Sequence, residues 1–203
     1  MEVDPLDTVE SLKTRSALVA SRLRRLNATV AISVALLATF MAICKVKDDN
    51  IVQAMQQAQA DKLDHWSYYQ ARNIRQEVAA ASALQLQALR ATIGNAAGAA
   101  ALDAMVQQQQ AVASDQAQKK TELKDAAAMD QQHYDALNFR DDQFDLADAL
   151  LAIAVALLAM TALTELWWLY WVSLLPTAGG VLMGLSGLAG WRFHPTALIQ
   201  LLS

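Results

Sequence analysis

Hydrophobic residues gather in three long runs, one near the start of the chain and two near its end. The runs cover residues 26–45, 149–171 and 174–193. At a rise of about 1.5 Å per residue, about 20 helical residues cross the hydrocarbon layer of a bilayer. The first run is longer than the core of a cleaved signal peptide, about 7–15 residues, so we expect it to remain as an anchor. The pattern predicts an all-α integral membrane protein with three transmembrane helices.

A long polar segment, residues 46–148, connects the first two runs and contains no proline. Proline removes a backbone donor and clashes with the preceding helical turn, so its absence permits long helices. Residues 94–98 contain glycine and asparagine, which accept the left-handed backbone at a helix end. We therefore expect a coiled-coil-like antiparallel helical hairpin outside the membrane, turning at residues 94–98, with residue i near residue 192 − i (roughly). The alternative is a break near residues 61–69 and a compact bundle.

The surfaces that face each other in this hairpin are expected to be rich in alanine and glutamine rather than leucine. Alanine permits close approach of two helices, and glutamine forms hydrogen bonds across an interface. Such a pair nevertheless buries little apolar area to offset the entropy lost in ordering it. We expect the hairpin to need neighbours, either copies of the same chain in a homo-oligomer or other subunits of a membrane complex.

The two ends of the chain are expected to lie on the membrane surface. Residues 1–25 suit an amphipathic helix, because Pro5 fits a first helical turn and apolar residues recur on one narrow stripe. A regulatory helix that binds a partner is the alternative for this segment. Residues 194–203 are mostly apolar and are expected to form an interfacial tail.

The densest group of aromatic and polar side chains lies in the first half of the polar segment. On a helix, Trp66 and Tyr69 share a face, and Tyr69 shares one with Arg72. Packing of one helix against the next is one interpretation. A recognition patch for another subunit is the other, because aromatic residues and arginine are frequent interface anchors. The candidate interface residues of this segment are Trp66, Tyr68, Tyr69, Gln70, Arg72 and Arg75.

The segment around these residues, DHWSYYQARNIRQ from Asp64 to Gln76, resembles the signature W-x-Y/F-Y-Q-A-K/R-x-I-K/R. This signature is similar to that of a bacterial membrane-protein family known only as domain of unknown function 4337. The order of one N-terminal span, a helical middle and a C-terminal pair of spans is similar as well. The resemblance implies a bacterial membrane protein and implies no activity.

The third hydrophobic run is rich in small residues. Gly180 and Gly184 form a G-x-x-x-G pair, which allows two membrane helices to approach closely. We expect this helix to contribute to self-assembly, so both glycines are candidate interface residues. A re-entrant or interfacial segment is the alternative, because the run is near the minimum length for a span.

Glu165 is the one acidic residue inside a predicted span. Acidic residues within membranes serve proton or ion pathways, which makes Glu165 a candidate for an ion path. The alternative is that it reaches the lipid headgroups or pairs with Arg192.

Four further acids crowd the start of the second span. In an oligomer they would form an acidic ring that concentrates cations. The alternative is a solvated face paired with Lys45 and Lys47. These candidate residues are Asp141, Asp142, Asp145 and Asp148.

Other features of the sequence argue against several classes of function. A net charge of −4 does not favour binding to nucleic acid. Cys44 is the one cysteine, so no intrachain disulfide forms, and the three histidines do not have a zinc-binding spacing. The sequence also lacks G-x-S-x-G, phosphate-loop and C-x-x-C motifs. We expect no enzymatic activity, no cofactor and no metal site.

Lysine and arginine are more frequent before the first span than directly after it. By the positive-inside rule, this bias favours a cytoplasmic N-terminus and a periplasmic hairpin in a bacterial inner membrane. Arg192, after the third span, favours the opposite orientation. The basic residues before the first span are Lys13, Arg15, Arg22, Arg24 and Arg25.

These features lead to two main hypotheses of function. The first is a non-enzymatic membrane scaffold or accessory subunit that self-assembles through its helical stalk and its small-residue span. The second is an oligomeric ion channel or transporter component, in which Glu165 and the four aspartates line a path. A weaker third hypothesis is a sensor whose stalk tip at residues 94–98 binds a partner.

Overall fold

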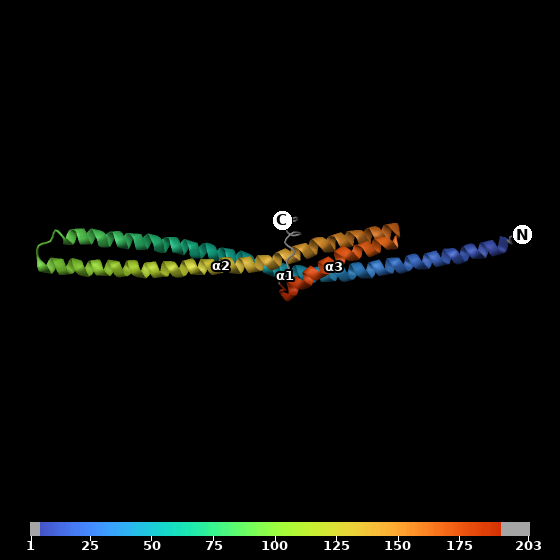
Figure 1. Cartoon of the computed structure of the whole chain (residues 1–203), viewed down its shortest axis with the longest axis horizontal. Helices are drawn as coiled ribbons and strands as arrows, with labels where there is room; N and C mark the ends of the chain where they lie inside the picture. Colours follow the sequence, from blue (N-terminus) through green and yellow to red (C-terminus); the bar gives the residue numbers. More distant parts are fainter. Residues whose placement is uncertain (1–4, 192–203) are drawn as a thin grey trace. The chain divides into compact units, whose positions relative to one another are not determined.

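The computed structural model describes residues 5–191, and their regular secondary structure is helical throughout (Figure 1). The elements are α1 (Pro5–Arg90), α2 (Ala96–Thr164) and α3 (Trp167–Ala189). Each of the three has a stretch long and apolar enough to cross a membrane. The predicted all-α class and its three apolar helices are therefore confirmed. The predicted tail 194–203 and Arg192 lie outside the described residues, as do most apolar side chains of the predicted N-terminal stripe.

Helix α1 is continuous because its sequence offers nothing that interrupts a helix. Pro5 is in its first turn, where a missing backbone N–H does no harm, and neither proline nor glycine follows before Gly94. The helix therefore runs without a break through the predicted first span and through residues 61–69, where a break was the alternative.

A short connection at residues 91–95 joins α1 to α2. The side-chain Oδ1 of Asn95 accepts a hydrogen bond from the backbone N–H of Gly98 at 2.6 Å, and the Asn95 carbonyl accepts one from Ala99. This is the geometry of an N-cap, which satisfies donors that the first helical turn leaves free. The connection thus lies slightly before the predicted turn at residues 94–98, and Gly98 belongs to the first turn of α2.

The connection between α2 and α3 differs from the prediction. The second span was expected to continue to residue 171, but α2 ends at Thr164 and α3 begins at Trp167. Glu165 has a left-handed backbone (φ 58°) and Leu166 is extended, so the chain reverses at the charged residue inside the apolar stretch. Pro176, which was expected near the start of the third span, lies well inside α3.

The chain forms two compact units. The terminal unit comprises Met1–Val52 and Asn138–Ser203, and the middle unit comprises Gln53–Leu137. In the terminal unit, buried leucine, valine and alanine side chains of α1 and α2 form the core. Its members are Leu26, Val30, Leu37, Leu151, Ala154 and Leu158.

The middle unit has a core of mostly small residues. Its buried apolar side chains come from α1 and α2, which lie side by side in this unit (Figure 1). They are Met55, Ala58, Ala79, Ala83, Ala99, Leu102, Val106 and Ala127. Because five of these eight are alanine, this unit buries few large side chains along its length.

Candidate functional site

A cluster of carboxyl groups lies where α1 packs against α2 in the terminal unit. Asp48 of α1 is buried, with 5 % of its surface exposed, whereas its neighbour Asp49 is exposed. The Nζ of Lys45 contacts Oδ2 of Asp48 at 2.8 Å and Oδ1 of Asp49 at 3.5 Å. One oxygen of the buried carboxylate is therefore neutralised by a lysine on the same helix.

The second oxygen of Asp48 has a different environment. Its Oδ1 is buried and has no hydrogen-bond donor among the described residues. The carboxyl group of Asp141, on α2, lies within hydrogen-bonding reach of Asp48. Burial, the proximity of Asp48 and the charge of Asp145 raise the pKa of Asp141 to about 6. Partial burial and Asp48 raise the pKa of Asp145 as well, and Lys45 opposes this effect.

A small pocket opens beside these carboxyl groups. It has room for a water molecule and lies next to Cys44, the one thiol of the chain, which is buried. Among the described residues, no group of three or more histidine, cysteine or acidic side chains has an arrangement that could hold a metal ion. The lining residues are Cys44, Lys45, Asp48, Phe144, Asp145 and Asp148.

The structure thus brings together several of the predicted acids and adds one that was not predicted. Asp141, Asp145 and Asp148 lie around Asp48 on the α1 face of α2. Asp48 was not among the candidate residues predicted from the sequence. A signal was available in its helical spacing, because residue 48 lies four residues after Cys44 and three before Ile51, and both of these are buried on the same face of α1.

The end of α3 is tied to α2 by polar side chains near the same cluster. Arg140 donates through Nη2 to the carbonyl oxygen of Gly187 at 2.9 Å. Gln143, which is fully buried, donates through Nε2 to the carbonyl oxygen of Trp191 at 2.9 Å. The last carbonyls of a helix lack partners within the helix, so these contacts satisfy groups that α3 would otherwise leave free.

The glycines of α3 pack inside the terminal unit. A Cβ added to Gly180 would lie 2.6 Å from Cγ of Leu151, and one added to Gly184 would lie 2.7 Å from the Phe40 ring. Gly187 meets the Phe144 ring in the same way, at 2.9 Å. The glycine pair predicted to serve contacts between copies therefore serves contacts of α3 with α1 and α2 in one chain.

Glu165 is exposed in the connection between α2 and α3. Its backbone N–H donates to the carbonyl oxygen of Thr161 at 2.9 Å, which ends α2. The acid predicted inside a span therefore lies at a helix terminus instead, beside the exposed indoles of Trp167 and Trp168.

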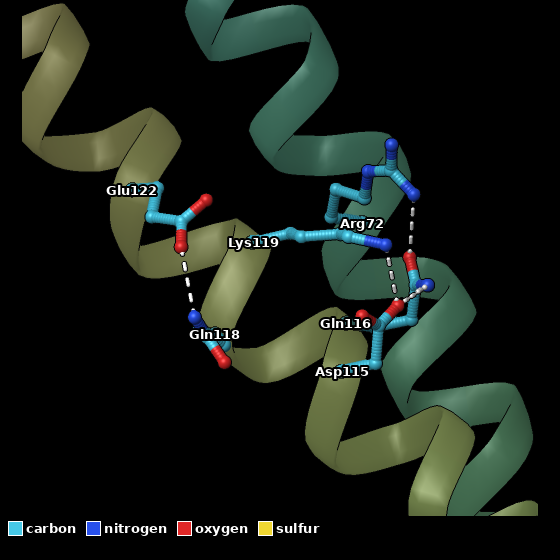
Figure 2. A network of polar contacts seen from close by, with 6 residues as sticks. All are labelled: Arg72, Asp115, Gln116, Gln118, Lys119 and Glu122. Atoms are coloured by element: carbon cyan, nitrogen blue, oxygen red, sulfur yellow. Dashed lines mark hydrogen bonds and ion pairs between the residues drawn. The ribbon is translucent and has the colours of Figure 1, made fainter.

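In the middle unit, only part of the predicted aromatic and basic cluster of α1 contacts α2. Tyr69 packs edge-on against Trp66, with ring centroids 5.2 Å apart, and Lys120 of α2 lies 6.0 Å from the Tyr69 ring. Arg72 reaches across to Gln116, donating to its Oε1 at 3.0 Å (Figure 2). Tyr68, Gln70 and Arg75 are exposed.

Further contacts join α1 and α2 along the middle unit. His65 Nδ1 lies 2.6 Å from Oδ2 of Asp130, Asn73 Oδ1 accepts from Lys120 at 3.0 Å, and Arg90 Nε lies 3.1 Å from Asp103. The partner's number falls as the α1 residue number rises. Exposed or half-buried polar pairs of this kind contribute about 0–1.5 kcal/mol each, so they fix the alignment of the two helices more than they add stability.

The outward face of α1 in this unit carries large aliphatic side chains. Leu63 and Ile74 are each 62 % exposed, Val78 is 60 % exposed and Leu89 is 51 % exposed. Successive positions are 11, 4 and 11 residues apart, which is about three, one and three helical turns, so the four fall on one face. The buried Ala79 and Ala83 lie on a different face. We call these four residues the α1 stripe.

The chain belongs to the family described as domain of unknown function (DUF4337), whose family model matches residues 26–190. The family resemblance of the segment from Asp64 to Gln76 is thereby confirmed. No curated protein and no solved structure matches the chain.

Proposed function

We propose that this DUF4337 chain is a non-enzymatic membrane scaffold or accessory subunit that assembles through its middle unit. In this proposal the helices of the terminal unit span a bilayer, and the middle unit is an antiparallel helical hairpin outside it. The observation that carries the proposal is the exposed α1 stripe, because large aliphatic side chains face outward where the unit's own core is mostly alanine.

Insertion of the terminal unit into a bilayer is supported by its surface. Large aliphatic side chains project outward from all three helices, among them Ile32, Leu36 and Leu175, each more than 60 % exposed. Exposed Trp167 and Trp168 at the connection between α2 and α3 suit the headgroup region, where amphipathic aromatic rings gather. In this arrangement Glu165 reaches the headgroup layer as well.

The hairpin is supported by the order of contacts in the middle unit. Lys62 hydrogen-bonds Gln131, Asn73 hydrogen-bonds Lys120, and Arg90 pairs with Asp103. Such an order fits two helices that pass each other in opposite directions from a connection at residues 91–95.

Assembly of copies follows from the α1 stripe and the bilayer together. Copies inserted into one membrane in the same orientation have parallel stalks, so each residue of the stripe meets its counterpart in the neighbouring copy. Aliphatic side chains in matching layers are the pattern that stabilises parallel helix association. Burial of the stripe between copies supplies the apolar area that the alanine-rich hairpin lacks.

The proposal is tested by the mass of the intact particle, extracted in nanodiscs and measured by native mass spectrometry. We expect a closed homo-oligomer for the natural sequence and a monomer for the double variant Ile74→Gln/Val78→Gln. The matched control is Leu84→Gln/Met129→Gln, which changes two equally exposed side chains away from the stripe and leaves the oligomer intact. A monomer for the natural sequence, or a particle that contains other polypeptides, contradicts self-assembly.

An ion channel or transporter component is the second candidate, favoured by the buried Asp48 among Asp141, Asp145 and Asp148. In that case the path runs between copies, because fully buried side chains such as Leu151 and Leu158 fill the core of the terminal unit. Flux of a cation through reconstituted vesicles separates the two candidates. With Asp145→Asn, a scaffold keeps its assembly and shows no flux before or after the change, whereas a channel keeps its assembly and loses flux.

We also propose a bacterial inner membrane as the location, with the N-terminus cytoplasmic and the hairpin periplasmic. Lysine and arginine before the first span support this orientation. Labelling of a cysteine introduced at exposed Ser67, in a Cys44→Ser background, with a membrane-impermeant maleimide tests it. Labelling in cells with a permeabilised outer membrane supports a periplasmic hairpin, and labelling only after disruption of the inner membrane contradicts it.

A further inference from the structure

The buried carboxylate of Asp48 is short of one hydrogen-bond donor. Oδ2 receives Lys45 Nζ at 2.8 Å, but Oδ1 is buried and has no donor among the described residues. An ionised oxygen withdrawn from water without a donor costs several kcal/mol, so such groups are normally paired. The arrangement therefore points to a ligand that supplies a donor at this oxygen.

The basic and phenolic side chains near Asp48 do not supply the missing donor, because they are exposed or have other partners. On α1, Lys45 already serves the other oxygen, and Lys47 and Asp49 are exposed. On α2, Arg140 is directed to the carbonyl oxygen of Gly187. The one titratable side chain of α3 is Tyr170, which contacts Ser33 instead.

Two kinds of group remain around Asp48. The thiol of Cys44 lies one helical turn earlier on α1 and does not reach the buried oxygen. The others are carboxyls of α2, which donate only when protonated: Asp141, Asp142, Asp145 and Asp148. Asp141 lies within hydrogen-bonding reach of Asp48. A proton on Asp141 gives it an O–H group, which can donate to the unpaired oxygen of Asp48.

We infer that Asp48 and Asp141 form a binding site for a single proton, which links α1 to α2 in the terminal unit. With the proton bound, the Asp141 O–H donates to Asp48 Oδ1, and the pair carries one negative charge that Lys45 balances. Without it, two carboxylates face each other across the helix interface, and Oδ1 of Asp48 loses its donor. The proton leaves to water through the pocket lined by Asp145 and Asp148.

The sign of the pH dependence follows from the same geometry. The pKa of Asp141 is raised in the folded chain, from 3.8 to about 6, by burial first and by Asp48 second. A group with a raised folded pKa stabilises the fold fully below its unfolded pKa, and this contribution is lost as the pH rises through the folded pKa. The contact between α1 and α2 at Asp48 is therefore strongest below about pH 4, and this contribution is lost between about pH 4 and about pH 6.

Infrared spectroscopy of the full chain in nanodiscs tests the site directly. We expect a carbonyl band of a protonated carboxylic acid that persists above the usual carboxyl range and titrates at about pH 6. Asp141→Asn should remove this band. Asp125→Asn, an exposed aspartate on the same helix, should leave it unchanged. Absence of the band at about pH 5.5, or its survival in Asp141→Asn, overturns the inference.

The thermal midpoint of the same samples gives a second, independent test. An amide at position 141 donates to Asp48 at every pH, so Asp141→Asn should raise the midpoint at about pH 7.5 and change it little at about pH 4.5. A lower midpoint at both pH values contradicts the shared proton. If magnesium or calcium ions raise the midpoint of the natural chain at neutral pH, but not that of Asp141→Asn, the site binds a metal cation and the inference fails.

Discussion

Adjacent residues of the same type have different roles in this chain, and their position on the helix decides which. Asp48 is buried and Asp49 is exposed, although the two carboxylates share a helix and the same lysine. Because both residues are aspartate, hydropathy alone does not distinguish Asp48 from Asp49. The side chain at 48 continues the buried face of Cys44 and Ile51, whereas the side chain at 49 is turned by about 100° to solvent.

Arg72 and Arg75 of the family signature offer a matched pair for testing this principle. Arg72 hydrogen-bonds the buried Gln116 across the middle unit, and Arg75 is exposed. We expect Arg72→Ala to destabilise the middle unit by about 1–2 kcal/mol, because it leaves a buried amide oxygen without a donor. Arg75→Ala should change stability by less than about 0.5 kcal/mol. Hydrogen exchange of the α1 amides near residue 72 measures both, and equal effects contradict the assignment.

Gly180 and Gly179 form a second matched pair, in α3. A methyl group at Gly180 meets Leu151 Cγ at 2.6 Å and the Ala147 carbonyl oxygen at 3.1 Å, whereas one at Gly179 meets a single terminal methyl of Leu150 at 3.2 Å. Gly180→Ala should lower the thermal midpoint, because overpacking at this site costs about 1–3 kcal/mol of folding free energy. Gly179→Ala should be neutral or stabilising, because alanine favours the helix. If Gly180→Ala instead keeps the midpoint and dissociates the oligomer, the glycine serves contacts between copies.

At the scale of the helices, composition predicted the elements well and their ends less well. The absence of proline and glycine between Pro5 and Gly94 accounts for the unbroken α1, and hydropathy located the three apolar stretches. The connection at Glu165 was not predicted, because a left-handed non-glycine residue has no sequence signal as clear as a glycine. Buried Asp48 was missed for a related reason: its role depends on a partner helix distant in sequence.

The N-cap of α2 can be tested as an element-level contribution. Asn95→Ala removes the side-chain oxygen that accepts the Gly98 N–H at 2.6 Å. We expect a loss of about 1 kcal/mol, confined to the first turn of α2. Hydrogen exchange should therefore accelerate at the amides of residues 97–99. Asn50→Ala, within α1, is the control, because the Asn50 side chain donates to the carbonyl oxygen of Val46 and caps no helix. If exchange at the amides near residue 50 accelerates as much in this variant, the effect comes from the loss of an asparagine and not from the loss of the cap.

At the scale of the whole chain, the two units differ in the side chains that they bury and expose. In the terminal unit, three helices pack through leucine, valine and glycine contacts, and the glycines of α3 contact α1 and α2 of the same chain. The middle unit brings two helices together through alanine and scattered polar pairs, and its large aliphatic side chains remain outside. In our proposal, the exposed aliphatic side chains of the terminal unit face lipid, whereas those of the middle unit face a second copy of the chain.

A cysteine placed on the α1 stripe tests how that neighbour is arranged. Ile74→Cys in a Cys44→Ser background should form a disulfide between copies under mild oxidation, because residues of parallel stalks meet their own counterparts within the roughly 4.4–6.8 Å Cα separation that a disulfide needs. Leu84→Cys is equally exposed but lies off the stripe, and it should remain reduced. Opposed stalks would place position 74 beside a residue without a thiol, and Ile74→Cys would then stay reduced. If Ile74→Cys stays reduced and the Leu84→Cys variant crosslinks, the copies meet through another face, and the stripe must then be covered by a different protein.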